Sequence, residues 1–535
     1  MYPNHIYSLK QIIIYFCKIQ FYLFWLGFGF LTLLAQPASE EKKVIKLSVE
    51  EAVKYVLENN PTIQTAKFEI LKSDTPYYKN ESQFSWRVVG GVEVVKSKAP
   101  SNRNNVFSGN RFTQDAVKVG IEKQFKTGTY FKAEVSNVRY DSNAFEGSSS
   151  SQFSFLAVPP MYTGALSLTI SQELLKNSFG KTEENTRKML QLEAVIKREE
   201  LLNQLTGLVA KTLVDYWSLS IAESAVTTYE KLLKSTINIR NLTVRKQRIG
   251  LAETYEIHQW NSVVSQIRSM LETAKNRRDE AKRNLIRVLN VDPRSEIQGV
   301  TQLTEELPGG YQLEKDIDYA YEHRIDLQNL RRQMMVTKYG LSNAEAEDVP
   351  SLKISGTYKS LGQSIESPSD NFTSMDRGIP STKYNNLSAQ IALSYPLWDK
   401  GIKSAIRDSN IEVSRLRVLE EDLRKQIKDE LHIRHDNIQK SYVILQNSKR
   451  TELEAERFYN GIYRRFSQGS YNALSVKKAL DNYVESQLGT IQARVNFNIN
   501  MLLYDLSKNY LFERFGVDVR KVMNQLLSKN DEFMK

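Results

Sequence analysis

The sequence predicts a protein of mixed α-helices and β-strands, in which two very long helices continue from amphipathic strands. The runs 181–248 and 401–467 contain no proline and repeat apolar residues at helical spacing. Segments of about ten residues alternate apolar and polar side chains, as strands with one apolar face do. The same order of elements then occurs twice along the chain, which indicates an internal repeat.

The bulk composition narrows the class of protein. Charged residues make up 25% of the 535 residues and the mean hydropathy is −0.45, which excludes a protein built from many membrane-spanning helices. The single cysteine, Cys17, cannot form an internal disulfide or a cysteine zinc site. The net charge of +11 is spread as mixed signs along the helices. We interpret it as solvated surface and expect no nucleic-acid partner, with a basic partner patch as the alternative.

The N-terminal segment has the pattern of an export signal. Lys10 and Lys18 precede an apolar run over 21–34, and the small residue Ala35 follows it. The run is short for a membrane-spanning helix, which needs about 20 apolar residues. We therefore predict a signal peptide over 1–35, with a retained anchor helix as the alternative.

The two long runs each carry an apolar stripe. The stripes are Ala222, Val226, Tyr229, Leu233 and Ile237 in the first run, and Leu416, Leu419, Leu423, Ile427 and Leu431 in the second. At about 1.5 Å per residue, each helix would be roughly 100 Å long. Patterns of this length favour a coiled coil or a helical bundle.

Six segments have the alternation of strands: 86–95, 116–125, 129–138, 164–171, 351–358 and 387–395. The loops 96–115, 139–163 and 360–386 are rich in Ser, Asn, Gly and Pro, whereas the turn at 126–128 is tight. This pattern is the weak signature of a membrane β-barrel with short turns on one side and long loops on the other. Strands of a soluble sheet are the alternative.

The internal repeat has two different offsets. Residues 50–70 resemble 314–334, an offset of 264, whereas 245–257 resemble 464–476, an offset of 219. The difference of 45 residues fits in the strand region, where the first half has four predicted strands and the second has two. In each half, the two shorter helices together match one long helix in length, which is the layout of a cylinder wall. Our hypothesis is six strands per chain.

Three motifs give the sequence a family resemblance. "LSVEEAVKYVLENNP" at 47–61 opens the first repeat, "LSYPLWDKG" at 393–401 joins a strand to a long helix, and an arginine-containing stretch leads to each of two glycine turns, near 250 and 469. The first-half counterpart of the corner, "LTISQELLKNSFG", has Glu173 where a proline is usual. In their order and duplication, from about residue 47 to 517, these motifs resemble those of the TolC-like outer-membrane efflux protein family, the outer membrane factors.

The resemblance implies an α+β membrane protein: a homotrimeric outer-membrane β-barrel continued by a long periplasmic α-helical coiled-coil barrel. It implies a passive exit duct of a tripartite efflux pump or a type I secretion system. The partners would be outer-membrane lipid, a periplasmic adaptor (membrane fusion) protein and an inner-membrane pump of the RND or ABC type. No enzymatic activity, metal or cofactor is expected. The alternative is an elongated periplasmic coiled-coil scaffold without a pore.

The expected domain organisation follows the repeat. It consists of the signal peptide 1–35, first-half short helices 36–85, first-half barrel strands and external loops 86–171, first-half long helix with tip turn and return helix 172–290, an equatorial linker 291–310, a second-half short helix 311–349, second-half barrel strands 350–396, second-half long helix with tip turn and return helix 397–510, and a C-terminal equatorial segment 511–535.

Three groups of residues are candidates for functional roles. At the strand-to-helix corner, Pro396 would end the strand, Asp399 would cap the helix and Gly401 would ease the bend. By the resemblance, the start of each return helix would form a periplasmic gate, although plain solvated helix starts are the alternative; the residues are Thr254, Tyr255, Glu256, Ser475, Lys478 and Asp481. The glycine turns would contact the adaptor through Arg248, Ile249, Gly250, Leu251, Gln468, Gly469 and Ser470.

Overall fold

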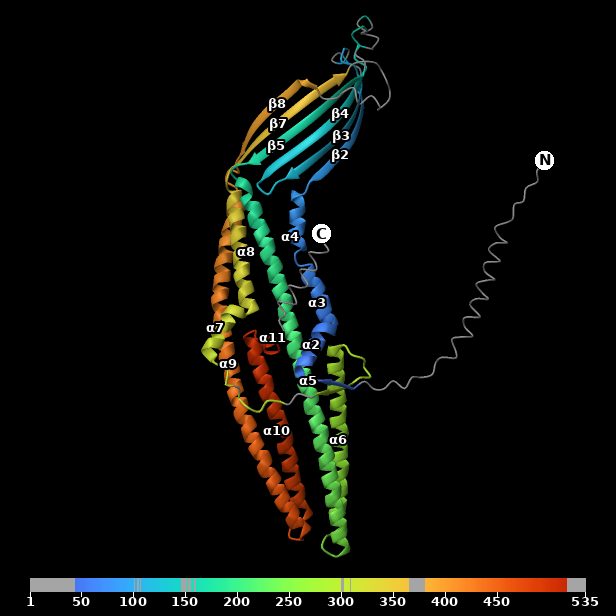
Figure 1. The fold of residues 1–535 in the computed structure, drawn as a ribbon, viewed down its shortest axis with the longest axis vertical. Helices are drawn as coiled ribbons and strands as arrows, with labels where there is room; N and C mark the ends of the chain where they lie inside the picture. The colour runs from blue at the N-terminus through green and yellow to red at the C-terminus, as the bar shows by residue number, and fades with distance from the viewer. Residues whose placement is uncertain are drawn as a thin grey trace, which may run out of the picture.

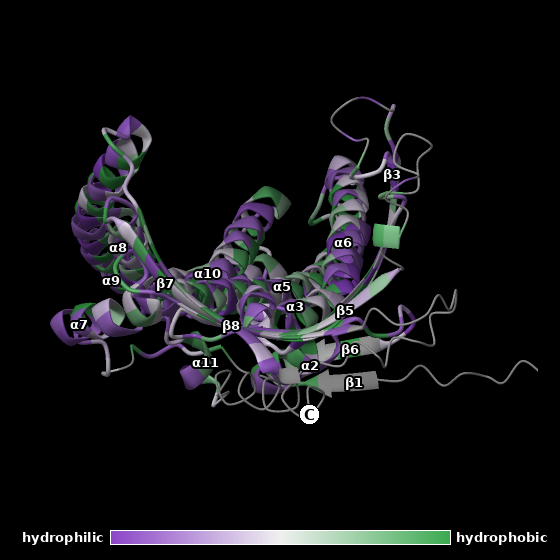
Figure 2. Cartoon of the chain, turned by 90° about the horizontal axis from the view of Figure 1, so that it is seen from above, coloured by the Kyte–Doolittle hydropathy of each residue, from purple (hydrophilic) through white to green (hydrophobic). Residues whose placement is uncertain are grey.

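The computed structural model describes residues 44–299, 303–364 and 381–516, except 101, 103–104, 106, 146–151, 153–154, 158–159 and 308. The expected signal peptide lies outside these residues. The described chain is elongated, with one β-sheet at one end and long helices running away from it (Figure 1). Viewed along the long axis, strands and helices form an open arc (Figure 2).

All six predicted strands are present, and they form one antiparallel sheet in the order β2-β3-β4-β5-β7-β8. Their bounds are Arg87–Lys98 for β2, Arg111–Gln124 for β3, Thr129–Ser142 for β4, Met161–Glu173 for β5, Ser351–Ser364 for β7 and Ser381–Ser394 for β8. Most strands are several residues longer than predicted, because the polar residues at their loop ends still pair. Within the sheet, β2 and β8 are the two edges.

The hairpin β3–β4 accounts for the mismatch between the repeat offsets. Strand β2 starts at residue 87 and β7 at 351, an offset of 264. The long helices start at 181 and 400, an offset of 219. The extra 45 residues therefore lie between β2 and β5, where β3 and β4 pair with each other and with both neighbours.

The sheet has one apolar and one polar face, because successive side chains of a strand point to opposite sides. On the apolar face the registers align Val119 with Val135 and Ile391 with Ile354. Val88 and Leu387, on the two edge strands, are 80% and 82% exposed. The opposite face carries paired polar groups such as Lys118–Glu93 at 3.4 Å and Lys132–Glu134 at 2.7 Å.

The helices form two antiparallel hairpins below the sheet. The long helices are α5 (Lys181–Arg248) and α9 (Lys400–Ser467), and the return helices are α6 (Thr254–Leu289) and α10 (Ala473–Ser507). Hairpins α5–α6 and α9–α10 pack side by side through α5 and α10, and towards the sheet α8 lies between α5 and α9 (Figure 1). None of the helices that the structure describes is both long and apolar enough to cross a bilayer.

The second-half segment predicted as one short helix is broken into two. Segment 311–349 forms α7 (Leu313–His323) and α8 (Ile325–Glu347), separated at Arg324 with φ −65° and ψ 123°. The repeat explains the break, since Arg324 is 264 residues after Asn60. Asn60 likewise separates α2 (Val49–Asn59) from α3 (Pro61–Leu71) with φ −68° and ψ 126°. The short helices α4 (Thr75–Glu81) and η1 (Ser82–Phe84) then lead into β2.

Of the apolar stripe predicted on α5, Val226 is buried, whereas the other four residues are half-buried. Towards the tip the buried residues step by four and three; they are Leu232, Thr236, Ile239, Thr243 and Lys246. Threonines occupy core positions because their hydroxyls donate to carbonyls four residues earlier, as Thr236 does to Leu232 at 2.8 Å. On α9, Leu416, Ile427 and Leu431 are buried as predicted, whereas Leu419 is exposed.

A belt of short elements crosses the helices midway. It contains the parallel pair β1 (Val44–Leu47) and β6 (Glu296–Gly299), together with α11 (Leu511–Arg514). Residues 303–307 cross from one hairpin to the other, and Glu305 binds Lys449 and Arg494 at 2.6 Å each. A core cluster of α2, α5, α6 and α10 residues lies beneath this belt.

Candidate functional site: the corners and the helical tips

The corner after β8 is built by three local interactions. Strand β8 ends at Ser394, two residues before Pro396, which has no N–H to donate to the ladder. The predicted cap at Asp399 is confirmed: its Oδ1 accepts from the amides of Gly401 at 2.7 Å and Ile402 at 3.2 Å. At the bend that Gly401 was expected to ease, Trp398 has a φ of 55°, and Gly401 itself lies in the first turn of α9. Gly401 instead lets the Asp399 carboxylate approach closely, since a Cβ there would lie 3.0 Å from Oδ1.

The first-half corner uses different chemistry for the same shape. Phe179, with φ 50°, precedes α5 by two residues, as Trp398 precedes α9. Both rings are largely exposed, at 70% and 82%. Glu173, where the resemblance would place proline, accepts hydrogen bonds from the Ser351 hydroxyl at 2.9 Å and the Leu352 amide at 2.8 Å. The carboxylate thereby ties the end of β5 to the start of β7.

The two glycine turns at the far ends of the helices are nearly identical. Gly250 and Gly469 have φ of 75° and 93°, a left-handed conformation that non-glycine residues adopt at a cost. Each turn has the two crossing hydrogen bonds of a Schellman cap. In the first, Leu251 donates to the Lys246 carbonyl at 2.8 Å, and in the second Ser470 donates to the Arg465 carbonyl at 2.9 Å. Arg248, Gln468 and both glycines are exposed there.

The predicted gate residues lie at the starts of the return helices, but they differ in what they contact. Thr254 and Tyr255 are exposed, and Glu256 is half-buried. In the second half, the Ser475 amide and hydroxyl both donate to Asn472 Oδ1, at 3.0 and 2.9 Å. Asp481 forms an ion pair with Lys477 at 2.6 Å, while Lys478 is exposed.

A buried lysine links the two hairpins just above the tips. Lys246 of α5 is 6% exposed, and its ammonium donates to the backbone carbonyl of Phe466 on α9. The ammonium lies 4.0 Å from the centroid of the Phe466 ring. Burial lowers the pKa of Lys246, and the charge of Glu256 acts in the opposite direction. Lys246 was not predicted as a functional residue, although a four-three spacing from Ile239 places it on the buried face.

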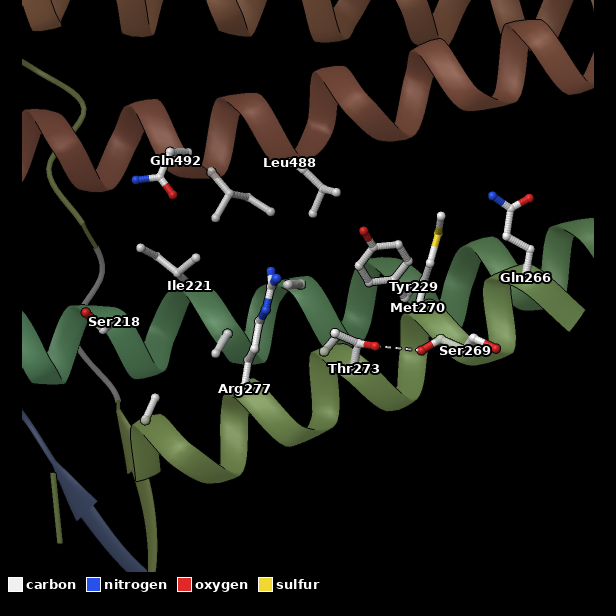
Figure 3. A pocket seen from close by; sticks show the side chains of 15 residues that line it. Ser218, Ile221, Tyr229, Gln266, Ser269, Met270, Thr273, Arg277, Leu488 and Gln492 are labelled. Carbon is white, nitrogen blue, oxygen red and sulfur yellow. Dashed lines mark hydrogen bonds between the residues drawn. The ribbon is translucent and has the colours of Figure 1, made fainter. Parts of the chain in front are cut away.

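The hairpins are packed together at the tip but separated above it. Around Lys246, one core cluster contains residues of α5, α6, α9 and α10, including Ile239, Trp260 and Val476. Between this cluster and the midway belt lies a cavity of about 790 Å³ among α5, α6 and α10 (Figure 3). Ile221, Tyr229 and Met270 line it on one side, and Leu488 and Gln492 of α10 line the other (Figure 3). The contact between the two hairpins at the tip is therefore separated from the midway belt by this cavity.

Both hairpins expose apolar side chains near their turns, namely Ile249 and Leu251 on the first and Tyr471 and Leu474 on the second. Ile249 is 70% exposed and Leu251 is 64% exposed. The equivalent positions 219 residues later are the polar Gln468 and Ser470. The two turns therefore differ in these two positions, which carry aliphatic side chains in the first turn and polar ones in the second.

The sequence matches no family model and no curated protein significantly. Solved structures do match its fold. The CmeC outer-membrane channel of Campylobacter jejuni aligns with a TM-score of 0.64 and 15% identity, over 90% of this chain and 89% of that chain. VceC, an outer-membrane protein of Vibrio cholerae, aligns with a TM-score of 0.61 and 12% identity, over 88% and 96%. The Neisseria gonorrhoeae MtrE channel, solved in its open state, aligns with a TM-score of 0.59 and 13% identity, over 86% and 89%.

These alignments cover 86–90% of this chain and 89–96% of the matched chains. The chain has the fold of outer-membrane channel proteins.

Proposed function

We propose that this protein is an outer-membrane channel-tunnel that serves as the passive exit duct of an efflux or secretion system. Its sheet would lie in the outer membrane and its helices would enclose water in the periplasm. The observation that carries this proposal is the two-faced sheet continued by long helical hairpins. A pore-free periplasmic scaffold would not need a sheet with an exposed apolar face, so we do not favour that alternative.

The apolar face fits a lipid environment. In lipid, every backbone N–H and C=O group needs a hydrogen-bond partner. For β-strands, only a closed barrel provides a partner for every such group. Large exposed apolar residues also gather where the sheet meets the helices, at the height expected for an interfacial girdle. They are Trp86, Phe125, Phe179, Tyr395, Leu397 and Trp398.

The edges of the chain fit closure by further copies of itself. Strands β2 and β8 have free edges of 12 and 14 residues, and they run in opposite directions because the sheet has six antiparallel strands. Edge β8 of one copy can therefore pair with edge β2 of the next and continue the antiparallel order. Such head-to-tail contacts close into rings. Three copies, as the family resemblance implies, would give eighteen strands.

The helix edges support the same arrangement. Along its free side, α9 exposes apolar residues that a neighbouring copy would cover; they are Ile411, Val418, Ile433, Val443, Ile444 and Phe458. Contiguous exposed apolar surface of this kind marks an interface. The experiment that tests the function is reconstitution of the purified mature protein. We expect it to require detergent and to form ion-conducting pores in planar bilayers. A protein that stays soluble and monomeric without detergent would contradict the proposal.

Within this function, we propose that the tips form the gate. Glu256 would contribute one carboxylate per copy near the tunnel entrance and attract cations. We expect the double variant Tyr255→Phe, Glu256→Ala to be leakier and less cation-selective than wild type. Single-channel conductance and reversal potential in a salt gradient measure both effects. Unchanged values would exclude these two residues from the gate.

We propose that the turns bind a periplasmic adaptor protein, which would connect the duct to an inner-membrane pump. The apolar turn at Ile249 and Leu251 would be the main contact. We expect a photo-crosslinker at 249 to capture the adaptor more efficiently than one at the polar position 468. Capture that is equal at both positions, or absent at both, would argue against an apolar docking turn.

A further inference from the structure

We infer that the sheet carries a binding site for the phosphate groups of a lipid head group, at the end of its apolar face that lies away from the helices. The site consists of Lys96 and Lys98 on β2 and Arg111 on β3. The inference rests on the proposed location of the sheet in the outer membrane. It adds a specific lipid ligand, which a passive duct does not by itself require.

The three cations lie close together on one face of the sheet. Because side chains alternate along a strand, Lys96 and Lys98 share the apolar face with Val94, and Arg111 shares it with Val117. The register places Lys98 directly opposite Arg111, and the Cβ atoms of such a pair lie about 4.5–5.5 Å apart. Lys96 is one pleat further along β2, about 7 Å away. All three residues are exposed.

The charge of this cluster is not compensated by the protein. Among the residues that the structure describes, no acidic side chain pairs with the three cations, because Asp115 and Asp141 on the same face bind Arg139, at 3.2 and 3.8 Å. Like charges directly opposite each other on neighbouring strands destabilise a sheet. The Lys98–Arg111 pair therefore costs folding free energy unless an anion lies between the two side chains.

The backbone beneath the cluster is held by hydrogen bonds. The Arg111 amide donates to Asn143 Oδ1 at 2.8 Å, and its carbonyl accepts from the Asn143 amide at 3.1 Å. Just after Lys98, the Ala99 amide donates to the Asn110 carbonyl at 2.7 Å. The cations therefore extend from paired strands, which keep their spacing fixed.

The height of the cluster matches the far head-group layer of a bilayer. Lys96 follows Trp86 by ten residues, and Trp86 lies where the sheet meets the helices. At about 3.3 Å per residue and a strand tilt of about 40°, this distance is about 25 Å along the membrane normal. The apolar band of an outer-membrane barrel is also about 25 Å tall. With Trp86 at the interface nearer the helices, the cations lie at the opposite interface (Figure 1).

A lipid phosphate fits this site better than a free phosphate ion. A guanidinium binds phosphate oxygens bidentately, and ammonium groups add point charges. Next to the cations towards the helices, Val94 and Val92 are 58% and 70% exposed on the same face. The acyl chains of a bound lipid would cover these residues, whereas a free ion would contact only the cations.

The site can be tested by titrating the purified full protein in detergent with bis-phosphorylated lipid A and measuring bound lipid by native mass spectrometry. We expect the triple variant Lys96→Gln, Lys98→Gln, Arg111→Gln to bind lipid A about a hundredfold more weakly than wild type. The matched control is Lys118→Gln, Lys353→Gln, Lys359→Gln. It removes three exposed cations from the opposite face and should bind as wild type does.

A second measurement uses only the wild-type protein, so it does not depend on the folding of a variant. Dephosphorylated lipid A should bind about as weakly as lipid A binds the triple variant. Equal binding of both lipids, or equal binding of lipid A by the triple variant and the control, would overturn the inference. Displacement of lipid A by equimolar inorganic phosphate would also overturn it, because the ligand would then be the free ion.

Pore formation separates this inference from the proposed function. We expect the triple variant to form wild-type pores in planar bilayers, because its substitutions lie on the face away from the lumen. A wild-type protein that forms no pores would contradict the proposed duct, whichever lipid it binds.

Discussion

Replacing Lys246 with methionine is expected to open the channel. The ammonium of Lys246 ties α5 to the last turn of α9 through the Phe466 carbonyl. A hydrogen bond to a charged group contributes about 1.5–3 kcal/mol, and each chain of the proposed trimer has one such link. Since about 1.4 kcal/mol changes an equilibrium tenfold, the variant should shift the closed-to-open equilibrium at least tenfold.

The measurement is single-channel conductance and open probability in planar bilayers. Methionine preserves the length and the apolar packing of the lysine stem, so the fold should survive. Lys231→Met is the matched control, because Lys231 lies on the same helix and is exposed. We expect the control to behave as wild type. A correctly folded Lys246→Met protein with wild-type open probability would show that the link does not hold the gate.

Of the substitutions proposed for this protein, Lys508→Ala is expected to lower the free energy of unfolding the most. The Lys508 side chain is 8% exposed and forms ion pairs with Asp316 at 2.9 Å and Asp505 at 3.8 Å. Three tyrosine rings surround the ammonium at 4.8–5.5 Å: those of Tyr311, Tyr504 and Tyr510. Breaking a buried pair by removing one partner typically costs about 3–5 kcal/mol. Lys508→Ala should therefore lower the midpoint of thermal loss of helical circular dichroism by about 5 °C or more.

The loss of stability caused by Lys508→Ala should depend on pH. Burial raises the pKa of Asp505, while Arg514 and Lys508 oppose the shift. A carboxyl whose pKa is raised on folding destabilises the folded protein as the pH rises through that pKa. Without Lys508 this cost grows, so the difference from wild type should be larger at pH 8 than at pH 5. Lys315→Ala, an exposed lysine at the edge of the cluster, is the control and should leave the midpoint unchanged. A thermal midpoint of Lys508→Ala that equals the midpoint of Lys315→Ala would contradict this account.

The architecture could be predicted from sequence because its signals are long and repeated. Proline-free runs mark α5 and α9, whose ends in the structure are residues 181 and 248, and 400 and 467. The two offsets of the repeat located an insertion among the strands, and β3–β4 lies there. The break in the second half carries no local sequence signal, because Arg324 is neither Gly nor Pro, whereas its first-half equivalent Asn60 is followed by Pro61.

The tip was harder to predict because its chemistry depends on contacts between distant segments. Lys246 has the pattern of an ordinary surface lysine, because two other basic residues, Arg245 and Arg248, lie beside it in the sequence. Its main partner, Phe466 at the end of α9, is 220 residues away in the sequence. The corner shows the same limit: the capping role of Asp399 is local and was predicted, whereas the bend at Trp398 depends on how the helix leaves the sheet.

The most direct test of the central claim is the accessibility of alternate residues on β8. In a Cys17→Ser background, single cysteines over 388–393 would carry a fluorophore in reconstituted protein. We predict that a quencher attached to lipid acts at 389, 391 and 393, and that a water-soluble quencher acts at 388, 390 and 392. If the water-soluble quencher acts equally at all six positions, the sheet does not lie in the membrane and the proposed duct is wrong.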